Sequence, residues 1–403
     1  MPSKAPIIEQ LKRPLRSLRW HLGWPHAARS EYFRDMLGGL SDDPGVEKAI
    51  EAGLAWLKRA QDCSTSRDGG VARHFSLLTG WSTSYPETTG YIIPTFLEHA
   101  HRIGDDELRL RARRMLDWLV QIQLPEGAFQ GSTIGSGPVV PTVFDTGQIL
   151  IGLAAGVHNF GNTYLPTLSR AADWLVKIQN AAGVWDAPNF FVDVDENADR
   201  PYETHVAWGM LEAAKVTGNE AYELAAVRNI EWALQFQQPN GWFSSCCLDE
   251  PKKPVTHTLG YALRGVIEGY LHTNSQKFLD AAILTADALL TTISSEGRIP
   301  GRLKADWSPG SSWVCVTGSV QIAACWLLLY KATGDARYRN AGFLTNEYVR
   351  RTLKMEGSAD VVGGVKGSFP VAGGYLPFQF LNWACKFMID SCTLELEIRN
   401  NNA

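Results

Sequence analysis

Apolar and polar positions follow a helical period through the middle of the chain, where one pattern is clearest. Residues 171–178 form an amphipathic segment whose apolar positions include Ala172, Leu175 and Ile178. After a polar loop, residues 203–217 are almost wholly apolar and end at Gly218, which suits the positive φ of a helix C-terminus. Together the two segments predict a helical hairpin, with the amphipathic helix first and the apolar helix second.

This hairpin recurs along the chain. A Trp, followed by Gln in the clear copies, marks the amphipathic helix, and the clear copies are 62, 56 and 58 residues apart. The marked positions are Trp56, Trp118, Trp174 and Trp232, with Ala288 and Tyr348 in two degenerate copies. The apolar helices keep the same period and begin near Glu87, Asp145, Glu203, Thr256, Thr317 and Asn382. The pattern therefore predicts six hairpins and twelve helices.

The two kinds of helix differ in burial. The apolar helices are rich in Gly and Ala and should be buried on both faces, whereas the amphipathic helices, such as residues 109–119, carry charge on one face. We therefore predict an all-α (α/α)6 toroid of six helical hairpins, with an apolar inner ring and an amphipathic outer ring. A linear solenoid is the alternative, but it would not need inner helices this apolar. Residues 44–403 are expected to form one toroid domain, after a basic amphipathic extension over residues 1–43.

The repeat also carries a family resemblance. A Gln-x-x-x-Gly-x-Trp pattern spans residues 179–185, with a variant at 237–242, and it resembles the repeat of terpenoid cyclases and of protein prenyltransferase β subunits. Six-hairpin glycosidases, polysaccharide lyases and sugar 2-epimerases share the same toroid. The resemblance covers about residues 45–395 and implies the fold rather than the function, because this fold hosts unrelated chemistries. Residues 363–390 also resemble toroid proteins encoded among bacterial exopolysaccharide genes, which implies a glycan-related role.

Composition narrows the partners. The net charge is −4 and no basic stripe dominates, so nucleic acid is not expected as a partner. The seven cysteines are scattered and indicate reduced core residues of a cytoplasmic protein. Metal-binding spacings of Cys or His do not occur, so we predict no metal and no cofactor. No stretch reaches the ~18 apolar residues of a membrane span. The oligomeric state is left open.

The N-terminal extension has two interpretations. It is basic and amphipathic but lacks a long apolar core, so it does not read as a secretory signal. One interpretation is a helix that packs across the bottom of the barrel. The other is weak contact with a membrane surface. The side chains that would make this contact are Lys12, Arg13, Arg16 and Arg19, beside Trp20 and Trp24.

The connections between helices are strongly asymmetric. Long loops run from each amphipathic helix to the next apolar one, whereas the opposite connections are short turns. The long loops are residues 62–86, 124–144, 180–202, 239–255, 294–316 and 355–381. Because loops on a rigid scaffold carry function, this asymmetry predicts a single functional mouth at the long-loop end.

The long loops and the adjoining helix ends are rich in aromatic and cationic side chains. Aromatic rings suit the flat faces of sugars, although they also suit an isoprenoid carbocation. Arg and Lys favour a uronate-containing glycan over an isoprenoid. The predicted substrate-binding residues are Arg73, His74, Trp81, Tyr85, Trp185, Tyr202, Trp242, Tyr261, Arg302, Trp307, Trp313, Lys366 and Trp383. The sequence thus favours an anionic oligosaccharide or polysaccharide as substrate.

Three acids recur at equivalent places. Glu87, Asp145 and Glu203 are 58 residues apart, and each lies at the start of an apolar helix. They could cap these helices or interact favourably with the helix dipoles. They could equally supply the acid and the base or nucleophile of glycoside hydrolysis, which needs two carboxyl groups at one cavity. We predict a catalytic role for all three.

Two histidines at the start of adjacent apolar helices support a different chemistry. His205 and His257 could be core residues, or one of them could act with a tyrosine to remove a proton next to a carboxylate. That reaction belongs to polysaccharide lyases and sugar epimerases, which are the alternative to hydrolysis. Both histidines are therefore candidate catalytic residues.

The isoprenoid alternative lacks its signatures. Residues 193–196 resemble the acidic motif of class II terpene cyclases but depart in the last acid and lack the Thr-Ala that follows it. The zinc ligands of prenyltransferases are absent, since Cys247, Asp249 and His257 occur in the wrong order. A carbohydrate-active hydrolase is therefore the main prediction. An isoprenoid cyclase-like or prenyltransferase-like enzyme and a non-catalytic glycan-binding toroid of polysaccharide biosynthesis remain as alternatives.

Overall fold

The computed structural model describes residues 23–37, 39–185 and 199–401, and most of them are helical. The outer helices are α3 (Val46–Asp62), α5 (Asp106–Ile122), α7 (Leu165–Ile178), α9 (Glu220–Ala233), α11 (Gln276–Leu290) and α13 (Ala336–Arg350). The inner helices are α4 (Pro86–Ile103), α6 (Val143–Phe160), α8 (Thr204–Thr217), α10 (Thr256–Thr273), α12 (Val316–Thr333) and α14 (Asn382–Asn401). Short 3-10 turns precede α7 (η1, Gly161–Tyr164) and α8 (η2, Pro201–Glu203) and follow α9 (η3, Leu234–Phe236).

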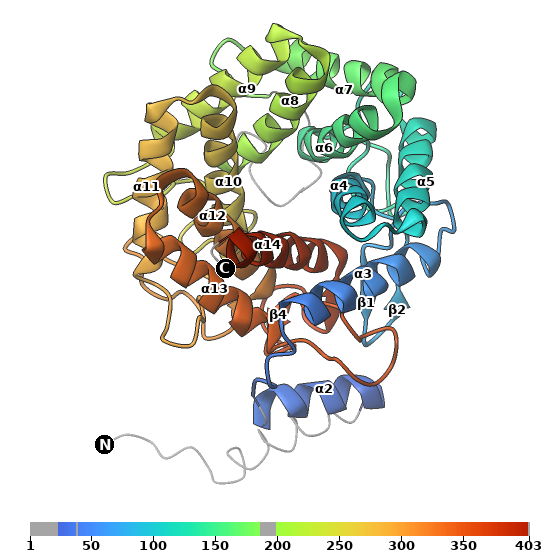
Figure 1. Ribbon diagram of the computed structural model, residues 1–403, viewed down its shortest axis with the longest axis vertical. Coiled ribbons are helices and arrows are strands. Elements are labelled where there is room, and N and C mark those ends of the chain that lie inside the picture. The colour runs from blue at the N-terminus through green and yellow to red at the C-terminus, as the bar shows by residue number, and fades with distance from the viewer. Residues whose placement is uncertain (1–22, 38, 186–198, 402–403) are drawn as a thin grey trace, which may run out of the picture.

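The inner helices form a closed ring inside the outer ones (Figure 1). Each inner helix packs against the next, from α4 through α6, α8, α10 and α12 to α14, and α14 packs in turn against α3 and α4. The ring is therefore complete, which an open solenoid would not be. The predicted (α/α)6 toroid is confirmed.

The repeat residues bind neighbouring copies together. The Trp of each clear copy faces inward, and Trp56, for example, is 1% exposed. The Gln after it crosses to the next outer helix: Gln179 donates to the carbonyl of Gly183 over 3.2 Å and to that of Ala225 over 2.8 Å. Gly183 has φ 96°, and a Cβ there would lie 2.5 Å from the carbonyl oxygen of Arg228. Only glycine fits this turn, which explains the Gln-x-x-x-Gly spacing physically.

Glycines also let the inner helices approach closely. A Cβ on Gly90 of α4 would lie 2.6 Å from Cα of Ile149 in α6. A Cβ on Gly318 of α12 would lie 2.6 Å from the backbone nitrogen of His257 in α10. The Gly content of the inner helices therefore sets the width of the inner ring.

The two ends of the toroid differ as predicted. Several inner helices end in a left-handed residue, such as Gly218 or Asn274, and a short turn leads to the next outer helix. At the other end the long loops add small strands. Strands β1 (His74–Ser76), β2 (Gly80–Trp81) and β5 (Gln379–Leu381) form an antiparallel sheet in the order β2-β1-β5, with Phe75 opposite Trp81 and Phe380. Strand β3 (Val314–Cys315) pairs with β4 (Ser368–Phe369).

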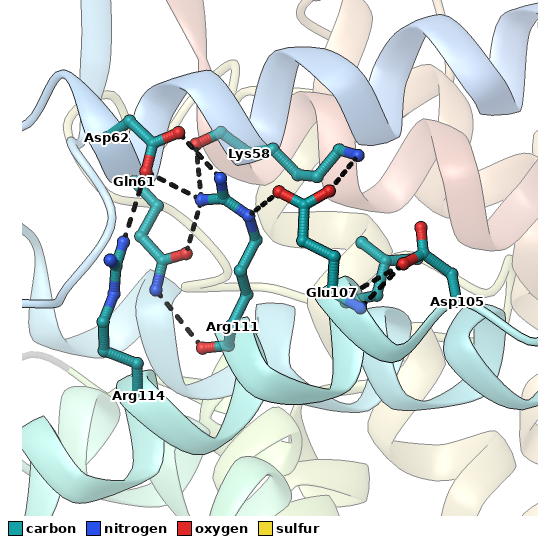
Figure 2. A network of polar contacts seen from close by, with 8 residues as sticks. Lys58, Gln61, Asp62, Asp105, Glu107, Arg111 and Arg114 are labelled. Atoms are coloured by element: carbon teal, nitrogen blue, oxygen red, sulfur yellow. Dashed lines mark hydrogen bonds and ion pairs between the residues drawn. The ribbon is translucent and has the colours of Figure 1, made fainter.

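Charged residues link the outer helices on the surface. Figure 2 shows such a network between α3 and α5, in which Arg111 donates to both oxygens of Asp62 over 2.8 Å and to Glu107 over 2.8 Å. Lys58 reaches Glu107 over 3.0 Å. Exposed pairs of this kind contribute about 0–1 kcal/mol each. The network therefore orients neighbouring helices more than it stabilises the fold.

Helix α2 (His26–Leu37) lies outside the ring (Figure 1). Its Asp35 pairs with Lys366, in the long loop before α14, so α2 packs at the long-loop end. The helix across the barrel bottom was expected for residues 11–24, nearly all of which lie outside the described residues, so the position of α2 does not test it. Lys12, Arg13, Arg16, Arg19 and Trp20 lie outside the described residues. Among the described helices, none combines the length and apolarity that crossing a membrane would require.

Candidate active site

A cavity of about 360 Å³ opens among the long loops, at the N-terminal ends of inner helices. Its lining comes from the loops before α4, α6, α8, α10 and α14 and from the adjoining helix starts, so five of the six long loops contribute. The predicted site residues that line it are Arg73, Tyr85, Glu87, Asp145, Tyr202, Glu203, His257, Tyr261 and Trp383. The structure thus brings together residues that are as far as 310 positions apart in the chain, counting from Arg73 to Trp383 (383 − 73).

The three acids are buried at this cavity. Glu87, Asp145 and Glu203 are 7%, 6% and 3% exposed. The N-cap residues of α4, α6 and α8 are Tyr85, Thr142 and Glu203, and none of these three makes a side-chain capping hydrogen bond. Capping by its side chain is thus excluded for Glu203 alone, whereas Glu87 and Asp145 lie in first turns, where the helix dipole favours a negative charge. All three carboxyl groups line the cavity.

Glu87 and Asp145 form an interacting pair. Thr142 donates its hydroxyl to Oδ2 of Asp145 over 2.7 Å, whereas Oδ1 is buried without a partner among the described residues. Burial raises the pKa of both carboxyl groups, and the charge of Asp145 raises the pKa of Glu87 further. The Tyr85 hydroxyl opposes this rise in pKa for both carboxyl groups. At neutral pH the pair consequently retains a proton.

Glu203 has a different neighbour. Burial raises its pKa to about 7, and the positive charge of Arg200 opposes this shift. Nη1 of Arg200 lies 3.6 Å from Oε1 of Glu203. A substantial part of Glu203 is therefore ionised at neutral pH.

Aromatic rings form the walls. Tyr261 lies edge-on to Phe144 with ring centroids 5.0 Å apart, and Tyr202 lies 5.9 Å from the same ring. Elsewhere in the lining, the guanidinium of Arg73 lies 5.0 Å above the ring of Trp383. The cavity thus combines flat apolar walls with a cation and buried acids.

The two histidines differ in position. His257 lines the cavity, and its Nδ1 lies 2.7 Å from Oε1 of Gln321. Burial lowers the pKa of His257 to about 4, so the ring is neutral. His205 is 1% exposed, pairs with Gln148 over 2.6 Å and packs 4.4 Å from Tyr261. The structure does not place His205 on the cavity surface but in the packing beneath it.

A second chamber of about 290 Å³ adjoins the first. Arg73, Tyr85 and Asp145 line both chambers, while His74 lines only the second. Burial and the neighbouring Arg73 lower the pKa of His74 to about 4. Asp145 therefore lies where the two chambers meet.

Four predicted aromatic residues support the loops instead of lining the cavities. The indole of Trp81 donates to Asp360 over 3.1 Å, and Trp185 is 3% exposed. Trp242 and Trp307 pack against each other with centroids 5.2 Å apart. These side chains are used in packing because the long loops need cores of their own.

The other three predicted contacts also lie elsewhere. Trp313 packs against Gly374, and a Cβ added to this glycine would lie 2.8 Å from the Trp313 ring. Arg302 forms a bidentate ion pair with Asp249, an acid that lines the cavity. Lys366 is 1% exposed and is bound by acids of α2. Its charge is neutralised inside the protein.

Sequence reasoning missed several lining residues. Arg200 and Thr142 lie three positions before Glu203 and Asp145, and this spacing was the available signal. No sequence signal marked Phe144 or Asp249 as residues of the cavity. Residues 193–196, the acidic motif, lie outside the described residues. Within the described ranges no group of three His, Cys, Asp or Glu side chains is arranged to hold a metal ion.

Fold and repeat together define an α/α toroid, and comparisons with known proteins agree. The model of the squalene-hopene cyclase C-terminal domain matches residues 84–265. No curated protein matches the chain.

Several solved structures share the whole toroid. Unsaturated glucuronyl hydrolase of Bacillus sp. GL1, described as responsible for glycosaminoglycan degradation, superposes with TM-score 0.69 at 15% identity, over 87% of this chain and 97% of that one. D-mannose isomerase gives TM-score 0.70 at 13% identity, over 88% and 97%. Cellobiose 2-epimerase of Bacillus thermoamylovorans B4167 gives 0.68 at 11%, over 92% and 98%. At these identities the likeness defines the fold, and the resemblance to the toroid superfamily is confirmed.

Proposed function

We propose that this protein is a carbohydrate-active enzyme that hydrolyses a glycosidic bond in an anionic, uronate-containing saccharide. The observation that carries the proposal is the set of three buried carboxyl groups at one aromatic-walled cavity. Hydrolysis needs one carboxyl group protonated and another ionised at the same pH. Glu87, Asp145 and Glu203 have the environments for this division.

The division of roles follows from the electrostatics. The Glu87–Asp145 pair retains a proton because burial and mutual repulsion disfavour two charges, so it acts as the general acid toward the glycosidic oxygen. Arg200 favours the charged form of Glu203, which supplies the ionised carboxylate that acts as the base or nucleophile. Protonation of the leaving oxygen and attack at the anomeric carbon then proceed from different carboxyl groups.

The charge of the substrate follows from Arg73. Its Nη1 contacts Nδ1 of His74 over 3.2 Å and Oε1 of Gln379 over 3.4 Å, and no described acid forms an ion pair with it. A guanidinium with free N–H groups above Trp383 suits a sugar carboxylate whose ring stacks on the indole. Because Arg73 and Asp145 line both chambers, the scissile bond lies where the two chambers meet, with one sugar in each chamber.

Two further considerations support a carbohydrate substrate. A cavity of about 360 Å³ is in the range of small-ligand sites and fits one or two sugar units. The toroid neighbours include glucuronyl hydrolases. The resemblance of residues 363–390 extends the proposal to exopolysaccharide biosynthesis in a bacterial cytoplasm.

Epimerase or lyase chemistry is the second candidate, and His257 favours it. The ring is neutral, lines the cavity and lies 4.3 Å from Tyr261 and 5.5 Å from Tyr375 by centroids. A neutral imidazole beside two phenols could move a proton at a sugar carbon. The isomerase and the epimerase among the neighbours are consistent with this chemistry.

A saccharide panel tests the proposal. Purified protein is incubated with uronate-containing and neutral oligosaccharides while reducing ends and the ultraviolet absorbance of unsaturated uronates are measured. We expect new reducing ends, without new absorbance, from uronate substrates. New absorbance would instead mean elimination and assign the chemistry to His257. Binding without turnover would indicate a glycan-binding toroid, and no binding would favour an isoprenoid substrate.

Variants test the carboxyl groups. Asp145→Asn and Glu203→Gln should lose turnover while saccharide binding, measured by calorimetry, persists. Glu107→Gln, in the surface network of Figure 2, is the matched control and should keep full turnover. Full turnover in both site variants would overturn the assignment.

A further inference from the structure

Helix α2 carries two acids that are unusually buried for a helix outside the ring. Glu31 is 2% exposed and Asp35 is 4% exposed. Nζ of Lys366 lies 2.6 Å from Oε1 of Glu31, and 2.6 and 2.8 Å from the two oxygens of Asp35. Charged side chains are rarely this buried unless they are paired. The cluster therefore joins α2 to the loop before α14 through charges that water does not screen.

The same acid also holds the backbone of that loop. Oδ2 of Asp35 accepts the N–H of Val371 over 2.8 Å. Ser368, two residues after Lys366, accepts the N–H of Tyr375 with its hydroxyl over 2.8 Å and donates to the carbonyl of Tyr375 over 2.7 Å. The contacts thus run from α2 through Lys366 and Ser368 to Tyr375.

Tyr375 lies at the wall of the candidate active site. Gly374, Tyr375 and Leu376 line the cavity, and the Tyr375 ring lies 5.5 Å from that of His257. Leu376 and Phe378 adopt positive φ of 47° and 60°. Side chains with this backbone conformation are strained and persist only where surrounding contacts hold them.

Trp24 supplies a further contact on the N-terminal side. Its ring meets Phe378 edge-on with centroids 4.6 Å apart. The segment around α2 therefore contacts the loop at Lys366, Val371 and Phe378, on both sides of the residues that face the cavity.

We propose that Glu31 and Asp35 are positioning residues of the candidate active site: through Lys366 and Val371 they fix the loop that places Tyr375 against the substrate. This inference rests on the proposed function, since it assigns the N-terminal helix to the saccharide site. It makes α2 a part of the site's architecture, although no α2 residue touches the cavity.

The test compares two aspartates in the full-length protein. Asp35→Ala removes the contacts to Lys366 and Val371, whereas Asp62→Ala removes a surface acid bound by Arg111 (Figure 2). We expect Asp35→Ala to raise KM for the saccharide about tenfold while kcat changes less than about twofold, and Asp62→Ala to leave both unchanged. A role confined to stability would lower the melting temperature of Asp35→Ala without changing KM.

Hydrogen exchange supplies a readout that does not depend on turnover. In Asp35→Ala the amides of Val371 and Tyr375 should exchange faster, whereas in Asp62→Ala they should not. Asp35→Asn keeps an oxygen for the Val371 N–H but loses the charge, so its KM should be intermediate, and it serves if Asp35→Ala does not fold. Unchanged exchange and unchanged KM in Asp35→Asn would overturn the inference.

The two proposals fail in distinguishable ways. If no saccharide binds the wild-type protein, the proposed function fails, and hydrogen exchange still tests whether α2 fixes the loop. If saccharides are turned over but Asp35→Ala behaves like Asp62→Ala in both assays, the function stands and the positioning role is refuted.

Discussion

Substituting Gly318 by Ala should push two inner helices apart beneath the candidate site. The added Cβ would lie 2.6 Å from the backbone nitrogen of His257, and ordinary contacts begin at 3.4 Å, so α10 and α12 must separate locally by about 0.8 Å (3.4 − 2.6). Oγ1 of Thr256 lies closer still, at 2.5 Å, but the backbone nitrogen of His257 cannot rotate away. Because His257 lines the cavity, the displacement reaches its wall.

The expected loss of stability follows from two opposing terms. Overpacking a close-packed interior costs about 1–3 kcal/mol. Replacing a helical glycine by alanine returns up to about 1 kcal/mol of helix propensity. The free energy of unfolding of Gly318→Ala should therefore fall by about 1–2 kcal/mol, as measured by the denaturant midpoint at unchanged slope.

Gly269→Ala is the matched control in α10. There the nearest atom to an added Cβ is Cδ1 of Ile230 at 2.7 Å, the end of a flexible side chain that can move aside. This variant should be neutral or more stable by up to about 1 kcal/mol. If Gly318→Ala unfolds within about 0.5 kcal/mol of the wild type, or if both variants shift alike, the close-approach explanation of the inner glycines is refuted.

Three further predictions concern charge. Burial raises the pKa of Glu203 from 4.5 to about 7, so the folded state loses stability as the pH rises through that interval. Glu203→Gln should therefore be more stable than the wild type by about 3 kcal/mol near pH 8 and equal to it near pH 4. Denaturant unfolding at each pH measures this difference. Arg73→Gln should raise KM for uronate substrates about tenfold and leave KM for neutral saccharides unchanged. Steady-state kinetics on matched uronate and neutral saccharides test this, and an equal change in the two KM values would contradict it. Arg350→Met removes one of the two cations paired with buried Glu395, leaving only the half-exposed Arg399, and also frees Asp43. The unfolding free energy should therefore fall by about 3 kcal/mol, the lower end of the cost of breaking a buried ion pair. A loss below about 1 kcal/mol in denaturant unfolding would show that this pair does not stabilise the fold.

The fold could be predicted because its causes are local and repeated. A Trp that must be buried and a Gln that must reach the next helix recur in four of the six outer helices, as at Trp174 and Gln179. Once the period is recognised, the inner helices and the end that bears the long loops follow. The acids at the start of the inner helices could be predicted for the same reason, since the period places Glu87, Asp145 and Glu203 at equivalent positions.

The remaining site residues could not be predicted, because their roles depend on distant partners. Lys366 reads as a loop cation, but Asp35, 331 residues earlier, neutralises it. Trp242 reads as a cavity aromatic, but Trp307 covers it. His205 and His257 are both the second residue of an inner helix, yet only His257 reaches the cavity. Such differences arise from packing between loops, which no periodicity encodes.

Contact of α14 with α3 and α4 has a consequence for how the chain can be rewired. These contacts make the junction between the last and first copies an interface like the other five, although no peptide segment crosses it. A circular permutant that links α14 to α2 and opens the short turn after Gly218 would preserve every interface of the ring. Deleting one hairpin would instead leave a gap that the remaining copies could not span. Where the chain starts is therefore interchangeable, but the number of copies is not.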